Sequence, residues 1–362
     1  MARGKSWLLG LVCAGAAGVL LFCSPWVGEG MRRGLAICAT VMIPSLFPFL
    51  ILSDFVARTQ VGRMLERPLG GVAKHLYHCP PQLAPAILMS WIGGYPAGAR
   101  VLAGMVEQKR LSPQDAGRAL AFCVNSGPAF LVAVVGAGVF RSPGWGLFLF
   151  GCQLAAGAVT GRILCRRPVL VRGSDAGGTL PPAAGLVRAV SSATAGMLSI
   201  CAFVLVFSAL CQVLEEAGLL AAASRWLSRA TGGVLTPGGA ACLWAGLLEI
   251  GGGCARAQAL PPGQGALVLP FLLSFSSCSV VCQLAACFGE QPVDSWLLLR
   301  ARLLHGALTA LLATPPLWRR FAAVPAMLTG RPVLAPGSGG LLGALCLMAM
   351  CAILLSTVEG DR

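Results

Sequence analysis

Apolar stretches about as long as a membrane-spanning helix follow one another along nearly the whole chain. A bilayer core takes about 20 mostly apolar residues per spanning helix. A soluble protein would need a polar face on most of these helices, and almost no stretch has one. Charged residues make up only 11% of the sequence, against about 25% in ordinary globular domains. The sequence therefore predicts an all-α polytopic membrane protein, with apolar elements at approximately 7–23, 33–57, 83–106, 117–140, 144–165, 186–214, 238–259, 265–289, 295–318 and 339–356.

The basic residues are placed as in a membrane protein. The net charge of +14 comes from 27 Lys and Arg residues against 13 Asp and Glu, an excess that would indicate nucleic-acid binding in a soluble protein. Here these residues lie in short connections between apolar stretches, which is typical of cytoplasmic loops. Examples are Arg162, Arg166, Arg167 and Arg172. We therefore expect the lipid bilayer as a partner, and no nucleic acid.

The sequence offers little for a metal centre or an enzyme. Most of the 16 cysteines lie inside apolar stretches and behave there as small hydrophobic residues. His75, His78 and Cys79 are close in sequence, but no fourth ligand is evident, so we expect a polar loop and no metal. Nucleophile-elbow, zinc-protease and phosphate-loop motifs are absent from the sequence. We therefore expect no enzymatic activity and no cofactor.

The chain divides into two similar halves. WIGGYPAGAR at 91–100 parallels EIGGGCAR at 249–256, and each motif precedes an apolar stretch broken by small polar residues, at 125–128 and 274–279. No clear cleavage site follows the first apolar stretch, so we expect it to remain as a helix. The predicted organisation is an N-terminal transmembrane helix at 1–32, a first repeat at 33–165, a cytoplasmic linker at 166–185, a second repeat at 186–318, and a C-terminal transmembrane helix and tail at 319–362.

The breaks within apolar stretches predict unusual membrane segments. Backbone groups freed at membrane depth are tolerated only where protein or a water-filled cavity satisfies them. We therefore expect re-entrant helical hairpins at 83–106 and 238–259, and broken transmembrane helices at 117–140 and 265–289. The other interpretation of the glycines is close helix packing, because Gly94 and Gly98 form a small-xxx-small pair.

The number of crossings predicts how the halves are oriented. If one element in each half does not cross, each half crosses three times, and the two repeats are inverted. With the N-terminus in the cytoplasm, this topology places more Lys and Arg on the cytoplasmic side than on the opposite side. Arg319 and Arg320 are exceptions to this bias.

Charged residues within the apolar stretches are the first candidates for a substrate site. Arg100 follows a glycine-rich turn and suits a carboxylate, although snorkelling to the interface is the alternative. Arg256 is placed similarly, and Glu249 either accepts a proton or pairs with an arginine. The predicted substrate-binding residues are Gly93, Gly94, Tyr95, Pro96, Gly98, Arg100, Asn125, Ser126, Gly127, Glu249, Gly251, Gly252, Arg256, Ser276, Ser277 and Ser279.

The motifs at 42–53, 93–100 and 125–130 resemble those of the YlbJ family of sporulation integral membrane proteins, which carries nucleoside-recognition Gate segments. The second half matches this family more loosely. The resemblance implies a fold similar to that of concentrative nucleoside transporters and a role in endospore formation. It also implies transport of dipicolinic acid across the outer forespore membrane. The family often has Lys where this chain has Arg100.

These observations favour a secondary transporter for a small anionic carboxylate, with dipicolinic acid as the expected substrate. A nucleoside carrier of related fold and a non-transporting scaffold for spore assembly are the alternatives. Carriers of the related fold are often homo-oligomers, and no residue here decides whether this chain forms one.

Overall fold

The computed structural model describes residues 14–15, 17–18, 20–164, 169–172, 179–289 and 293–322, and within these residues its regular elements are helices. Within these residues, five segments are long and apolar enough to cross a membrane. They are Ser24–Arg58, Pro143–Leu164, Pro182–Glu216, Pro262–Phe288 and Trp296–Phe321. Most of the predicted helix 7–23 and all of 339–356 lie outside the described residues. The predicted all-α polytopic membrane fold is confirmed.

The first spanning segment is one helix with a wider turn inside it. α2 (Ser24–Ile37) continues through the π-helical turn η1 (Cys38–Met42) into α3 (Ile43–Arg58). Pro44 and Pro48 follow this turn, and a proline ring removes a backbone donor and crowds the preceding turn. A π turn is one of the local adjustments that accommodates such a residue in a membrane helix.

The rest of the first half contains a hairpin and a broken helix. α4 (Gln60–Tyr77) and the short turn η2 (Pro81–Leu83) lead into α5 (Ala84–Gly93) and α6 (Tyr95–Glu107). The next elements are α7 (Pro113–Ala119), an extended stretch, α8 (Pro128–Phe130), the π-helical η3 (Leu131–Ala137) and α9 (Pro143–Leu164).

The second half repeats this order. Its elements are α10 (Pro182–Glu216), α11 (Leu219–Ala230), the pair α12 (Pro237–Leu248) and α13 (Ile250–Gln258), the pair α14 (Pro262–Phe275) and α15 (Cys278–Phe288), and α16 (Ser295–Phe321). Each half thus has a long helix, a shorter amphipathic helix, a helical hairpin, a broken helix and a final long helix.

Equivalent long helices of the two halves pack antiparallel. A Cβ on Gly30 of α2 would lie 2.5 Å from the Cα of Ala209, and at the other end a Cβ on Gly185 would lie 2.5 Å from Thr59. The helix α2–α3 and the helix α10 therefore run in opposite directions. The same holds for α9 and α16. Trp145 packs on Phe321 with ring centroids 5.5 Å apart, and further along α9 a Cβ on Gly157 would lie 3.4 Å from His305, which is earlier in α16. Opposite directions for equivalent helices are what inverted repeats require.

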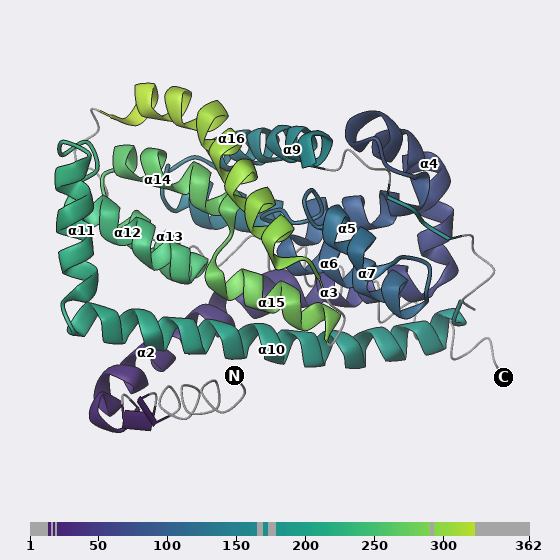
Figure 1. Ribbon diagram of the computed structural model, residues 1–362, viewed down its shortest axis with the longest axis horizontal. Helices are drawn as coiled ribbons and strands as arrows, with labels where there is room; N and C mark the ends of the chain where they lie inside the picture. Colours follow the sequence, from purple (N-terminus) through teal and green to yellow (C-terminus); the bar gives the residue numbers. More distant parts are fainter. Residues whose placement is uncertain are drawn as a thin grey trace, which may run out of the picture.

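The two hairpins approach from opposite ends of the molecule (Figure 1). Helix α10 runs the length of the view, with α11 at one end and α4 near the other. The hairpin α5–α6 lies toward the α4 end, and α12–α13 lies beside α11. Leu198 of α10 and Leu311 of α16 are 67% and 71% exposed, as expected for side chains that face lipid.

Helices α4 and α11 lie between the apolar stretches expected from the sequence, in the gaps at 58–82 and 215–237. Both are amphipathic, with basic side chains such as Arg67 and Arg225 on one face and apolar side chains on the other. Such a helix has a low mean hydropathy, so a search for apolar stretches misses it. An amphipathic basic helix suits the membrane surface.

A polar centre between the two halves

The first hairpin turns at Gly94. Its φ of +81° is a backbone conformation that glycine adopts readily, and the arms α5 and α6 return alongside each other. A Cβ on Gly98 would lie 2.5 Å from Ser90, so this glycine lets the arms approach. A Cβ on Gly94 would lie 3.0 Å from the backbone nitrogen of Gly127. The hairpin tip therefore touches the break in the first broken helix.

Side chains satisfy the backbone groups freed at that break. Gln153 of α9 accepts from the Ser126 N–H at 3.1 Å and donates to the Ser126 carbonyl at 3.1 Å. Asn125 Nδ2 donates to Ser90 Oγ at 2.9 Å and to the Phe122 carbonyl at 3.1 Å. This arrangement fits the rule that an interrupted membrane helix needs neighbouring side chains as partners.

The first break also reaches the second broken helix. Ser126 Oγ donates to the Leu273 carbonyl at 2.8 Å, and the Tyr95 hydroxyl donates to the same carbonyl at 2.6 Å. The hydroxyls of Tyr95 and Ser126 also contact each other. Tyr95, at the start of α6, therefore joins the first hairpin to both broken helices.

The second break lies at Ser276 and Ser277, between α14 and α15. Ser276 has a φ of +76°, which ends α14. Ser277 caps α15, because its Oγ accepts from the Val280 N–H at 3.2 Å. Ser279 accepts from Gln283 Nε2 at 3.1 Å. All three serines are fully buried.

The tip of the second hairpin is chemically different. Glu249 separates α12 from α13, and its carboxylate accepts from the N–H groups of Gly251 at 2.9 Å and Gly252 at 2.5 Å. It is only 2% exposed. Glu249 therefore caps α13. A Cβ on Gly251 would lie 3.0 Å from Ile37 of α2, so this tip packs against the first spanning helix.

The two arginines predicted to bind substrate are in ion pairs at the sides of the hairpins. Arg100 donates to Asp54 Oδ2 at 2.6 and 2.8 Å, and also to the carbonyl and hydroxyl of Ser192. Arg256 forms a two-point pair with Glu215 at 2.5 and 3.1 Å. Both acids come from the end of the first long helix of the same half. In this conformation the charges of both arginines are balanced.

The cation at the centre is Arg302 of α16, which the sequence analysis did not select. Its guanidinium is fully buried. It donates to the carbonyls of Val124 at 2.6 Å and Ala121 at 2.7 Å, and reaches those of Leu120 and Ser274 at 3.3 Å. A cation is favourable beside the free carbonyls at the end of a helix. Arg302 therefore joins the first broken helix to α14.

Two further side chains of α16 lie on the same face of the helix. His305 Nε2 lies 2.8 Å from the Gln153 carbonyl, and Thr309 donates to Ser274 Oγ at 2.7 Å. Residues three and four apart share a helix face. This polar stripe in an apolar helix was visible in the sequence, and such residues inside membrane helices often mark a functional site.

Four buried polar atoms at this centre have no hydrogen-bond partner among the described residues. They are Asn125 Oδ1, Ser276 Oγ, Arg302 Nε and His305 Nδ1. A Cβ on Gly157 would lie 3.6 Å from Asn125 Oδ1, and 3.4 and 3.6 Å from Nε2 and Cε1 of the His305 ring, so both side chains approach the same point of α9. Unpartnered buried polar atoms mark places where a ligand or water can bind. The polar centre is defined here as these four residues.

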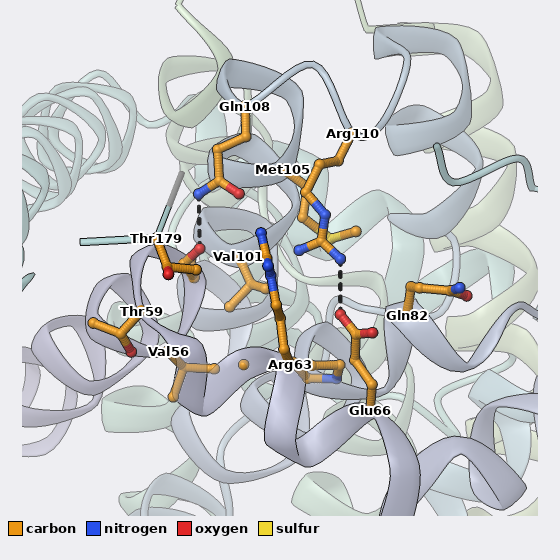
Figure 2. Close-up of a pocket in the computed structure, with 13 residues that line it drawn as sticks. Val56, Thr59, Arg63, Glu66, Gln82, Val101, Met105, Gln108, Arg110 and Thr179 are labelled. Carbon is orange, nitrogen blue, oxygen red and sulfur yellow. Dashed lines mark hydrogen bonds and ion pairs between the residues drawn. The ribbon is translucent and has the colours of Figure 1, made fainter. Parts of the chain in front are cut away.

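A separate small pocket, partly open to solvent, lies at the base of the first hairpin. Figure 2 shows Arg110 beside Glu66, 2.8 Å apart, and Gln108 donating to the Ala57 carbonyl at 2.8 Å. Val101 and Met105 line this pocket. They lie about two and three helical turns along α6 from Gly94. The pocket is therefore distinct from the polar centre.

Comparisons with known proteins agree with this architecture. No family model matches the chain. The chain is 25% identical to the sporulation integral membrane protein YlbJ of Bacillus subtilis (strain 168) over 316 residues, which cover 78% of this chain and 75% of that protein. The solved structure of CNTnw N149L in the intermediate 3 state has a similar fold, with a TM-score of 0.51 and 15% identity over 91% of this chain and 87% of that one. The chain is thus a multi-pass integral membrane protein, similar in sequence to YlbJ and in fold to CNTnw.

Proposed function

We propose that this protein is a secondary transporter that moves a small anionic carboxylate across a membrane, and that it has no enzymatic role. The observation that carries the proposal is the polar centre itself. The tip of the first hairpin contacts the first break, and both contact α14 just before the second break. Transporters built from inverted repeats hold their substrates near the midplane, at discontinuous helices of this kind.

The antiparallel halves support an alternating mechanism. Because equivalent helices run in opposite directions, a movement of one hairpin opens the centre toward one side, and the equivalent movement of the other opens it toward the opposite side. The residues of the centre are at most 1% exposed, so this conformation is closed to both sides. The contacts of Tyr95 and Gly94 with the first break are those that such a movement would separate.

Charge supports an anionic substrate. Arg302 is buried and has no acidic partner among the described residues. A buried cation without a counter-ion is costly, so an anion in the centre would lower its free energy. The similarity to YlbJ supports a role in sporulation. We therefore propose dipicolinic acid as the substrate and the outer forespore membrane as the location.

Uptake by the purified full-length chain in proteoliposomes tests the function. We expect labelled dipicolinate to accumulate above the level in protein-free liposomes, and uridine to remain at that level. Uptake of uridine alone would favour a nucleoside carrier. If neither solute is taken up or bound, the scaffold alternative replaces the transport proposal.

A further inference from the structure

The polar centre divides by hydrogen-bonding chemistry into two sides. On the donor side, Arg302 Nε carries an N–H and Ser276 carries a hydroxyl. Neither meets the geometric criteria for a hydrogen bond among the described residues, and the Ser276 hydroxyl lies close to that of Tyr95. Ser276 lies in the connection between α14 and α15, and Nη1 of Arg302 reaches the end of α14 at the Ser274 carbonyl. A cation and a hydroxyl side by side suit an anionic acceptor such as a carboxylate.

The other side of the centre offers acceptors. Asn125 Nδ2 already donates twice, which fixes the amide so that its Oδ1 is the unpartnered atom. His305 Nε2 lies against a carbonyl and therefore carries the hydrogen, which leaves Nδ1 as an acceptor in the neutral ring. A buried acceptor without a partner costs free energy, so a ligand that donates a hydrogen bond to these acceptors would bind more tightly.

Few charged groups surround His305. Among the described residues, Arg302 is the charged group that acts on this ring. The elements packed on this part of α16 present Gly157 and Gln153 from α9 and Phe271 from α14, and none of these titrates. A second cation next to Arg302 would be costly in a buried site, which favours the neutral imidazole. The protein itself therefore offers no proton for the acceptor side, and we assign that proton to the ligand.

We propose that the polar centre binds an organic anion that carries one carboxylate and one hydrogen-bond donor, and that a dicarboxylate binds in its singly protonated form. The carboxylate accepts from Arg302 and Ser276, and the carboxyl proton is donated toward Asn125 or His305. This inference rests on the proposed transport function and names the chemical form of its substrate. A fully ionised dicarboxylate lacks the donor, and an uncharged nucleoside lacks the carboxylate.

The choice of ligand tests this pairing on the unaltered full chain. The compounds are isophthalate, its monoamide, its monomethyl ester and its uncharged diamide. The monoamide has a permanent donor beside its carboxylate, whereas the ester has none. We expect the monoamide to bind about tenfold to a hundredfold more tightly than either the ester or the diamide, the usual range for losing one hydrogen bond in a buried site.

The pH dependence adds a second readout. An ordinary carboxyl group has a pKa of about 4, so between about pH 5 and pH 8 the singly protonated fraction of isophthalate falls about tenfold per pH unit. Isophthalate binding should therefore weaken as pH rises. Binding of the monoamide should stay constant over the same range, because its donor does not titrate. The monoamide thus controls for any effect of pH on the protein.

Substitutions test the assignment of Arg302. In Arg302→Gln the preference for the monoamide over the diamide should disappear, and Arg302→Lys should retain part of it. Arg300→Gln is the matched control, since Arg300 lies on the same helix but is exposed. This preference is a ratio of two dissociation constants, so a general loss of stability would not remove it. If Arg302→Gln does not fold, the ligand series on the unaltered chain still decides the question.

The outcomes separate this inference from the proposed function. Equal binding of the monoamide and the ester, or an unchanged preference in Arg302→Gln, would overturn the site even if dipicolinate is transported. The expected ligand order without dipicolinate uptake would leave the site standing and refute dipicolinate as the substrate. If none of the carboxylates binds, the site is refuted.

Discussion

Two equivalent ion pairs with different burial give a direct test of the architecture. Arg100 and Asp54 fasten the first hairpin to α3, and their side chains are 11% and 4% exposed. Arg256 and Glu215 occupy the corresponding place in the second half, where the side chains are 28% and 37% exposed. The same chemistry at repeat-equivalent positions makes each pair the control for the other.

The perturbation is to neutralise each acid, with Asp54→Asn and Glu215→Gln. Asp54→Asn leaves a buried guanidinium without its counter-ion, which costs about 3–5 kcal/mol. The remaining contacts of Arg100 with Ser192 place the expected cost toward the lower end of this range. Glu215→Gln breaks a partly exposed pair, for which about 0–1 kcal/mol is usual. The difference of about 2–4 kcal/mol corresponds to roughly 30-fold or more in the folded-to-unfolded ratio.

The assay is unfolding of the purified protein by SDS in mixed micelles, followed by the loss of helicity in circular dichroism. We expect Asp54→Asn to lower the free energy of unfolding clearly more than Glu215→Gln does. The double variant Asp54→Asn/Arg100→Gln should recover part of the loss, because it removes the unpaired charge. Equal effects of the two single variants, or no recovery in the double variant, would show that the buried pair does not hold the first hairpin.

Three further predictions concern the hairpin tips and the topology. Gly94→Ala should abolish dipicolinate uptake in proteoliposomes while the protein still inserts, because Gly94 has a φ of +81° and a Cβ there would lie 3.0 Å from Gly127. The control is Gly71→Ala in α4, where the space around the glycine is open, and this variant should transport normally. Glu249→Gln should lower the free energy of unfolding by about 1–3 kcal/mol in SDS titration, since an amide offers one acceptor oxygen where the carboxylate offers two to Gly251 and Gly252; a stability equal to wild type would contradict the capping role. Single cysteines at Lys74 and Lys109, on a cysteine-free background, should react with a membrane-impermeant thiol reagent from one side, and one at Arg225 from the other; labelling of all three from the same side would refute the inverted arrangement.

The breaks and hairpins were predictable because the residues that cause them act locally. Gly94 and Pro96 end one helix and start the next through their own backbone chemistry, and Ser276 and Ser277 do so in the second half. Such effects depend on neighbours in sequence. The boundaries of both hairpins and both breaks were therefore close to those in the structure.

The pairing of charged residues was not predictable in the same way. Arg100 meets Asp54, which lies 46 positions earlier, because of how α3 packs on α6. Arg302 reaches carbonyls about 180 positions away, which lie in the other half. A single sequence contains no record of which helices become neighbours. The sequence alone could not rank the arginines within apolar stretches as candidates for substrate binding.

The tips of the two hairpins differ, and that difference has a consequence for the resting state. If the halves were identical, exchanging their conformations would interconvert two states of equal free energy, and each would be equally populated. Here one tip is the bare backbone of Gly94, and the other is a buried carboxylate that caps its own helix. Opening at Glu249 exposes a charge to a new environment, whereas opening at Gly94 does not. In the proposed carrier, the empty protein therefore has unequal populations facing the two sides of the membrane. The substrate then has a different apparent affinity from each side, while the gradient alone sets the direction of net transport.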